Sequence, residues 1–248
     1  MSVDRGTDLH THSDLTDGAD SPELMADAAL SAQLTTWGLS DHVRADSTWV
    51  GDYERLVRAL RRDELNIRCG VEVKILDRSG RLDLPANLPA LDYVLVADHQ
   101  FPGVDGPVSP REMTRRLVAG EITSTAVVDQ LVSATCAAVA AAPFPAVLVH
   151  LFSLLPKMGL SEDEVGDEHR SALADACRTH DAAVEINEKW RCPSARTLDY
   201  LAAAGVVVVA GSDAHRCADI GAWSYLDEVA PPVRDEHPDV RRTVILRG

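Results

Sequence analysis

The sequence predicts an α/β fold in which seven strands and the helices between them form one closed or nearly closed TIM-like barrel. Short β-rich runs alternate along the chain with longer helical patterns, as expected for strand–helix repeats. Several runs are apolar throughout, such as the four valines at 206–209, and this is typical of strands buried on both faces. The predicted strands cover residues 7–12, 35–41, 67–73, 93–97, 146–150, 183–186 and 206–210. An open doubly wound sheet is the alternative topology, although no GxGxxG of a Rossmann site follows the first strand.

The predicted helices begin with recognisable capping residues. A serine before a first-turn proline predicts an N-cap at Ser21. A serine followed three residues later by glutamate forms a capping box, and this pattern begins at Ser109 and again at Ser161. Helical patterns cover residues 23–33, 168–180 and 194–204, and Gly205 is typical of the residue that ends a helix.

The composition predicts a single soluble domain spanning residues 1–248. Barrels of this kind often occupy about 250 residues. The net charge of −15 argues against a broad surface for long nucleic acids, which needs clustered basic residues, but does not exclude cleaving a phosphate ester in a pocket. The apolar region 134–152 is interrupted by Pro143, Pro145 and His150, so no membrane span is expected. Five cysteines without a CxxC pair predict reduced thiols in the cytoplasm. The oligomeric state is left open.

Histidines and carboxylates gather at the ends of the predicted strands. Those at strand ends or just beyond them are His10, His12, Asp41, His42, Glu72, His99, His150, Asp213 and His215. In a parallel barrel all the strand C-termini open on one face, so six of the seven strands deliver a metal-type ligand to one mouth. His10 and His12 are two apart on a strand, which points both side chains to the same side. The other histidines, His169, His180 and His237, are expected to be solvated.

These ligand types predict a centre of several divalent metals. Imidazoles and carboxylates without thiolates suit Zn, Mn or Fe, and the sequence does not choose among them. One four-coordinate ion would need only three or four of these groups, so the surplus predicts two or three metals with at least one bridging carboxylate. Metals about 4 Å apart can bind a phosphate ester, activate a water and stabilise the leaving oxygen.

In their order along the chain, these residues resemble the PHP (polymerase and histidinol phosphatase) superfamily. The segments similar to its DxHxH, SDG, T/S-D-H, GxE, isolated histidine and GSDAH motifs are Asp8-Leu9-His10-Thr11-His12, Thr16-Asp17-Gly18, Ser40-Asp41-His42, Gly70-Val71-Glu72, Asp98-His99, Val149-His150 and Gly211-Ser212-Asp213-Ala214-His215. The resemblance implies a distorted (β/α)7 barrel with a trinuclear metal centre.

The resemblance also implies a ligand set. One metal would be held by His10, His12, Glu72 and Asp213. Glu72 would bridge to a second, together with His99 and His150, and a third would be held by Asp17, His42 and His215. The residues expected to act in catalysis are His10, His12, Glu72, Asp213 and His215. Asp17 has an alternative interpretation as part of an Asp-Gly turn that needs no metal.

Within the superfamily the chain resembles the short histidinol-phosphatase branch, through Val184-Glu185-Ile186-Asn187 and the stretch that follows. It departs from that branch after His150, where Leu151-Phe152-Ser153 stands in place of proline and aspartate, and after Asn187. These departures predict a different substrate pocket. Arg191 and Arg216 follow the last two strands and are candidates for binding phosphate oxygens, because a planar guanidinium suits them. Lys74 and Lys157 are weaker candidates.

The function predicted from the residues and the resemblance is metal-dependent hydrolysis of a phosphate monoester, with a small phosphorylated metabolite as substrate. The sequence leaves three alternatives. A phosphodiesterase or exonuclease on short nucleotides could use the same metals, although an aromatic content of 4% argues against long strands. An amidohydrolase also opens with HxH, but the positions of Glu72 and Asp213 disfavour it. A non-catalytic regulatory barrel would have no need of the whole ligand set.

Overall fold

The computed structural model describes residues 2–231 and places seven parallel strands in one sheet. Their order is β1-β2-β3-β4-β7-β8-β9, which is the order along the chain. The strands are β1 (Thr7–Asp8), β2 (Thr36–Leu39), β3 (Asn66–Lys74), β4 (Tyr93–Ala97), β7 (Ala146–Val149), β8 (Ala183–Asn187) and β9 (Val207–Gly211). A parallel bridge between Thr11 and Ala214 joins the first strand's continuation to the last, so the sheet is a nearly closed barrel. The predicted distorted (β/α)7 barrel is confirmed.

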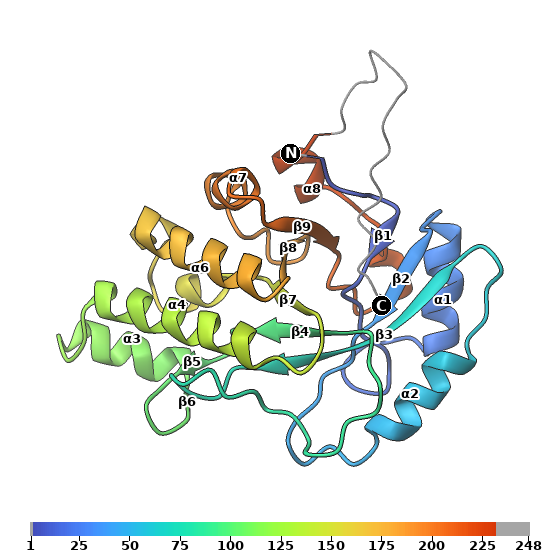
Figure 1. Ribbon diagram of the computed structural model, residues 1–248, viewed down its shortest axis with the longest axis horizontal. Helices are drawn as coiled ribbons and strands as arrows, with labels where there is room; N and C mark the ends of the chain where they lie inside the picture. Colours follow the sequence, from blue (N-terminus) through green and yellow to red (C-terminus); the bar gives the residue numbers. More distant parts are fainter. Residues whose placement is uncertain (1, 232–248) are drawn as a thin grey trace.

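The helices lie outside the sheet and follow its strands around the barrel (Figure 1). They are α1 (Pro22–Ser31), α2 (Val50–Ala59), α3 (Pro110–Val118), α4 (Ser124–Ala141), α5 (Leu154–Lys157), α6 (Asp167–Thr179), α7 (Ala195–Ala203) and α8 (Tyr225–Val229), with short 3-10 turns at Glu162–Glu164 and Cys217–Asp219. A small hairpin, β5 (Phe101–Pro102) with β6 (Pro107–Val108), follows β4. The sequence did not predict this hairpin or helix α2.

The predicted N-caps at Ser21 and Ser109 are confirmed, because each hydroxyl accepts a hydrogen bond from the backbone N–H three residues on. The capping box at Ser161 was wrong as the start of a helix. Ser161 begins only a 3-10 turn, because Val165 leaves the helical conformation and buries its side chain in the core. Helix α6 then starts afresh at Asp167.

The first strand is shorter than predicted. Only Thr7 and Asp8 pair with β2, whereas residues 7–12 were expected to form a strand. Beyond Asp8 the chain still contacts the end of β2, where the Ser40 N–H donates to the Thr11 carbonyl at 2.9 Å, and it also contacts the closing strand, where the His12 N–H donates to the Ala214 carbonyl at 2.9 Å. The HxH residues therefore lie where the barrel closes, between the end of β2 and the segment after β9.

Alternating residues of the strands divide the core into an inner and an outer layer. Tyr93, Leu95 and Ala97 of β4 are buried inside the barrel, while Val94 and Val96 face the helices. Tyr93 fills the barrel below the mouth and donates its hydroxyl proton to the Leu9 carbonyl at 2.7 Å. Gly70, opposite Tyr93 on β3, leaves room for this ring, because a Cβ there would lie 2.2 Å from the Tyr93 Cζ.

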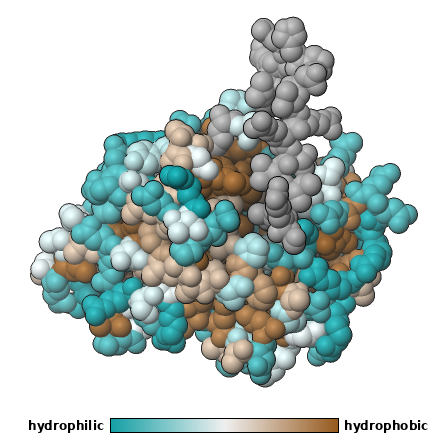
Figure 2. Space-filling view, viewed as in Figure 1, coloured by the Kyte–Doolittle hydropathy of each residue, from teal (hydrophilic) through white to brown (hydrophobic). Residues whose placement is uncertain are grey.

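Helix α4 is the one helix of residues 2–231 that is long and apolar enough to cross a membrane by length and composition. Its residues Val127, Val128 and Leu131 are buried in the hydrophobic core, and the helix packs against α6. In the structure it is therefore a covering helix of the barrel. On the face drawn in Figure 2, hydrophilic residues cover the periphery and apolar residues lie toward the centre. All five cysteines are free, as predicted.

Candidate metal centre

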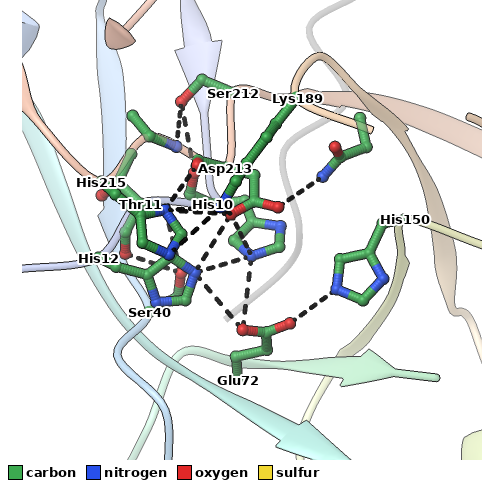
Figure 3. A network of polar contacts seen from close by, with 12 residues as sticks. His10, Thr11, His12, Ser40, Glu72, His150, Lys189, Ser212, Asp213 and His215 are labelled. Atoms are coloured by element: carbon green, nitrogen blue, oxygen red, sulfur yellow. Dashed lines mark hydrogen bonds and ion pairs between the residues drawn. The ribbon is translucent and has the colours of Figure 1, made fainter. Parts of the chain in front are cut away.

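The imidazoles of His10 and His12 meet at the barrel mouth. Their Nε2 atoms lie 3.0 Å apart, and both rings are buried. The Glu72 Oε2 atom lies 3.7 Å from the first and 3.4 Å from the second. The Asp213 Oδ1 atom approaches the same two nitrogens at 3.9 and 3.7 Å. Two imidazoles and two carboxylates thus face one point, as Figure 3 shows.

Glu72 is the centre of the cluster. Its Oε1 lies 3.0 Å from the His99 Nε2 and 2.9 Å from the His150 Nε2, while its Oε2 lies 2.9 Å from the His42 Nδ1. Figure 3 shows the carboxylate between His150 on one side and His10 and His12 on the other. Because β3 continues past Glu72 to Lys74, the glutamate is held inside a regular strand. A carboxylate contacted from both sides has the placement of a bridging ligand.

Asp17 lies in a loop that the rest of the site holds in place. Its Oδ2 lies 3.3 Å from the His42 Nε2 and 3.4 Å from the His215 Nε2, so the loop is more than an Asp-Gly turn. Buried Asp41 accepts hydrogen bonds from the Ser13 N–H and from the hydroxyls of Ser13 and Thr16. Gly18 packs directly on the chain, since a Cβ there would lie 2.1 Å from the His12 carbonyl oxygen.

The residues fit divalent cations. Within residues 2–231 the buried His12 Nδ1 has no hydrogen-bond partner, which costs free energy unless another group satisfies it. The buried Glu72 Oε2 makes no hydrogen bond of regular geometry there, although the His42 Nδ1 lies 2.9 Å from it. Three sets of ligand atoms within residues 2–231 each lie within 4.8 Å of one another: His10, His12 and Glu72; His42, Glu72 and His99; and His12, Asp17, His42 and His215. Oxygen and imidazole ligands in overlapping sets are the environment of Zn, Mn or Fe clusters.

The ring orientations are set by carboxylates outside the cluster that the sequence analysis did not assign to the site. The His10 Nδ1 lies 2.7 Å from the Glu185 Oε1, and the His150 Nδ1 lies 3.3 Å from the Asp98 Oδ1. When Nδ1 donates its proton outward, the Nε2 lone pair points to the cluster. Glu185 is a charged residue facing inward from the middle of an apolar strand, and that pattern could have revealed it.

Glu185 also supports a strained backbone. His150 and Asp213 have φ angles of 33° and 54°, in the left-handed region that side chains other than glycine rarely adopt. The second Glu185 oxygen accepts the His150 N–H at 2.8 Å and a proton from the Asn187 amide at 2.8 Å. Such strain persists only where surrounding contacts enforce it and is common at functional sites.

The protonation of the cluster follows from burial and neighbouring charge. Burial lowers the pKa of His12 well below its usual value, which leaves the ring neutral, as a metal ligand must be. Burial also acts to lower the pKa of His150, but hydrogen bonds to Asp98 and Glu72 outweigh it and raise this pKa to about 10. Burial acts to raise the pKa of Glu72, but the charges of His99 and His10 hold it well below its usual value.

The residues predicted to bind substrate lie at different distances from the cluster. Arg216 lines a cavity of about 660 Å³ together with Asp213 and His215. Arg191 pairs instead with Glu228 and stacks over the Tyr225 ring, so its predicted role gains no support from this geometry. The reason is the direction of the loop after β8, where Arg191 has a φ of 52°.

Lys189 is a site residue that the sequence analysis missed. Its Nζ lies 3.2 Å from the Asp213 Oδ1 and 3.1 Å from the His215 Nδ1. It is 42% exposed, so its ammonium group is accessible at the edge of the cluster. Lys157, one of the weaker candidates, lies over the Trp190 ring at 3.8 Å from its centroid. The position of Lys189 within the motif-bearing loop after Asn187 was the only indication in the sequence.

Of the three histidines expected to be solvated, His180 is exposed and His237 lies outside the described residues. The prediction for His169 was wrong. It is buried at the start of α6, where its Nδ1 accepts the Gly166 N–H at 3.0 Å and its Nε2 lies 2.8 Å from the Asp129 Oδ1. Its role is to cap a helix and join α6 to α4.

The barrel and its mouth define a class of protein: a parallel α/β barrel with a cluster of histidines and carboxylates at the C-terminal ends of its strands. The model of the PHP domain family matches residues 8–187, so the chain belongs to the PHP domain family. No curated protein sequence matches the chain significantly.

Solved structures share the fold. The hisK protein from Listeria monocytogenes superposes with a TM-score of 0.61 at 15% identity, over 87% of this chain and 97% of that one. The histidinol phosphate phosphatase from Lactococcus lactis, complexed with Zn, L-histidinol and phosphate, superposes with a TM-score of 0.63 at 16% identity, over 90% of this chain and 93% of that one.

Proposed function

We propose that this protein is a metal-dependent phosphoric monoester hydrolase that acts on a small phosphorylated metabolite and resembles histidinol phosphatases. The observation that carries the proposal is the convergence of the predicted ligands, with Glu72 between the two halves of the cluster. The Lactococcus relative, which was solved with Zn, L-histidinol and phosphate, supports the same chemistry.

We propose the division of ligands that the resemblance implies; the ligand sets of the structure overlap it but place His42 with Glu72 and His99, and His12 with Asp17, His42 and His215. One metal would be held by His10, His12, Glu72 and Asp213, a second by Glu72, His99 and His150, and a third by Asp17, His42 and His215. Divalent cations bound there would supply a water of lowered pKa and positive charge for the phosphate oxygens.

The protein's own groups prepare this site. Glu185 and Asp98 orient two imidazoles, so that binding requires little rearrangement. The Lys189 ammonium and the Arg216 guanidinium line the cavity on the Asp213 side, where they can bind phosphate oxygens. Hydrolysis breaks the bond between phosphorus and the leaving oxygen, forms one to the water oxygen, and returns a proton to the leaving group.

The same domain is proposed to extend beyond the family match. That match ends at Asn187, but β9 pairs with β8 along its whole length and carries Asp213 and His215 back to the mouth. We propose one PHP domain over residues 1–248, a location in the cytoplasm, and no long nucleic acid as partner.

The test is hydrolysis by protein supplied in turn with Mn and Zn. We expect turnover of para-nitrophenyl phosphate, with much slower turnover of the diester bis(para-nitrophenyl) phosphate, two or three bound metals by mass spectrometry, and loss of both turnover and metal in His10→Ala. His180→Ala is the matched control, because His180 is exposed at the end of α6, just before the N-terminal end of β8 and hence at the opposite end of the barrel from the mouth. Preferred cleavage of the diester would support the phosphodiesterase alternative. A folded His10→Ala variant with full activity would refute the proposal.

A further inference from the structure

A second cavity, of about 600 Å³, opens on the other side of the metal-ligand cluster. Asp17, His42, Glu72 and His99 form its inner wall, so a phosphate on the metals would have its leaving group directed into this space or into the Arg216 cavity. Its outer wall carries Arg44, Lys74 and the indole of Trp49. Breaking the phosphate ester does not require these three side chains. They therefore bear on which substrate the cavity accepts.

Lys74 faces the same interior as Glu72. Residues two apart on a strand point to the same side, and β3 includes both. At about 3.3 Å per residue, Lys74 lies about 6–7 Å further along the strand than the bridging carboxylate. Asp83 holds it there, with its Oδ2 3.4 Å from the Nζ and both side chains largely buried. The Asp83 pair leaves other ammonium protons free to bind a ligand.

Arg44 is the second cation of this wall. Within residues 2–231 its guanidinium makes no ion pair and no hydrogen bond, although its backbone is fixed. The Arg44 N–H donates to the Ser47 hydroxyl at 3.0 Å, and the next N–H, of Ala45, donates to the Asp83 Oδ1 at 2.9 Å. The carboxylate that positions Lys74 thus also anchors the loop that carries Arg44.

Neither cavity offers a free carboxylate to a positively charged leaving group. In the first, the acidic residues of the wall are Asp17 and Glu72, both proposed metal ligands. In the Arg216 cavity, Glu188 accepts the N–H groups of Ser224, Tyr225 and Leu226 at the start of α8. Asp219 pairs there with Arg216 at 3.1 Å, and the third carboxylate of that cavity, Asp213, is a proposed metal ligand.

We propose that the leaving group of the substrate carries its own acidic group, a carboxylate or a second phosphate, which Arg44 and Lys74 bind. This inference rests on the proposed monoester hydrolysis and narrows its substrate class. The proposed substrate class differs from that of an enzyme whose product is an amino alcohol, such as the histidinol bound to the Lactococcus protein. Charge-assisted hydrogen bonds from two cations to one acidic group give both affinity and discrimination against a cation in its place.

The experiment compares four short esters on the metal-loaded protein: 3-phosphoglycerate, glycerol bisphosphate, glycerol phosphate and phosphoethanolamine. We expect kcat/KM for the carboxylate or the second-phosphate ester to exceed that for glycerol phosphate by about tenfold or more, with phosphoethanolamine slowest. The acidic ester with the higher kcat/KM shows whether the acidic group is a carboxylate or a second phosphate. Arg44→Glu is expected to reduce the ratio of acidic to neutral ester by at least about tenfold and to increase the relative rate of phosphoethanolamine. Arg55→Glu is the control, because Arg55 is exposed on α2 and, among residues 2–231, forms an ion pair with Asp52 alone.

A binding measurement gives a readout that does not depend on turnover. By calorimetry, 3-phosphonopropionate is expected to bind more tightly than propylphosphonate, and Arg44→Gln to reduce that ratio of Kd values about tenfold. Failure to hydrolyse para-nitrophenyl phosphate would overturn the proposed function and this inference with it. Hydrolysis of the aryl ester with no preference for acidic esters, or a preference that Arg44→Glu leaves unchanged, would overturn this inference alone.

Discussion

The Nε2 atoms of His10 and His12 lie 3.0 Å apart although neither residue lies in a regular strand. The Glu185 carboxylate contacts the Nδ1 of His10. Both Nε2 atoms therefore face the same point beside Glu72. Two nitrogen lone pairs this close repel each other unless a proton or a cation lies between them.

Glu72→Gln removes the charge at the centre of the cluster while keeping the shape of the side chain. We expect the number of bound metals to fall and aryl phosphate turnover to drop by more than about 100-fold, because one carboxylate contacts both halves of the site. Metal analysis and steady-state kinetics measure the two effects. Glu164→Gln, at an exposed turn, should leave both unchanged. Full metal content in Glu72→Gln would show that this carboxylate does not bridge.

Glu185→Gln weakens metal binding from outside the ligand set. The amide can no longer hold the His10 ring through a charged acceptor, so we expect metal affinity to fall by about 10–100-fold with the fold retained. Competition with a chelating dye gives the affinity, and circular dichroism checks the fold. Unchanged affinity would mean that Glu185 only supports the His150 backbone.

Metal should stabilise the protein. Because the ligand residues come from both ends of the chain, the unfolded state cannot hold the site together. Free metal at 100 times its Kd is expected to add about 2.7 kcal/mol to the free energy of unfolding. Urea unfolding with EDTA and with added Mn or Zn measures the difference, and coincident curves would contradict a high-affinity site.

Gly70→Ala should destabilise the barrel. The new methyl group would overlap the Tyr93 ring, and overpacking of this kind costs about 1–3 kcal/mol. Gly51→Ala is the matched change in helix α2, where the Cβ meets nothing closer than an Arg55 nitrogen at 3.7 Å. There the gain in helix propensity should stabilise by about 0.5–1 kcal/mol. Thermal or urea unfolding that ranks the two variants in the opposite order would contradict the packing described.

Cys177 makes stability depend on alkaline pH. Burial raises the pKa of this thiol from its ordinary 9.0 to about 12 in the folded protein. The folded state therefore holds the proton more strongly, so this contribution is fully present below pH 9 and is lost as the pH rises toward 12, at about 1.4 kcal/mol per pH unit. In Cys177→Ala, the free energy of unfolding from urea titrations should fall less steeply between pH 9 and 11 than in the unaltered protein. At pH 7–8 the two proteins should show the same slope, and equal slopes throughout would refute the prediction.

Part of the fold follows from local sequence. The apolar β4 is a strand buried on both faces, as such runs predict, and Ser21 and Ser109 cap helices through their own hydroxyls. These properties depend on neighbours within a few residues. The valine run of β9 also forms a strand, but the prediction that both of its faces are buried was wrong, because Val207 is exposed and Val208 and Val209 are only partly buried at the edge of the nearly closed barrel. At Ser161 the local capping pattern does not predict the structure correctly. Burial of Val165 against residues distant in the sequence outweighs the pattern.

In the site, too, some residues follow from local sequence and topology and others do not. The histidines, Glu72 and Asp213 were predictable because the topology of a parallel barrel brings all strand ends to one mouth. Lys189, Asp98 and the pairing of Arg191 with Glu228 were not, because no local rule states which way a side chain beyond the end of a strand turns. Glu185 lies within β8, and a charged residue in the middle of an apolar strand was a signal that could have revealed it.

The sequence by itself determined the order of the seven barrel strands, the helices with clear capping patterns and the residue types at the mouth, since periodicity, capping and chemical type are local properties. Only the tertiary structure decided how the segment after the first strand contacts both the end of β2 and the closing strand, and which carboxylates orient His10 and His150. It also decided that Lys74 and Arg44 share one wall. These are contacts between residues far apart in the chain, and their geometry depends on the packing of the whole barrel.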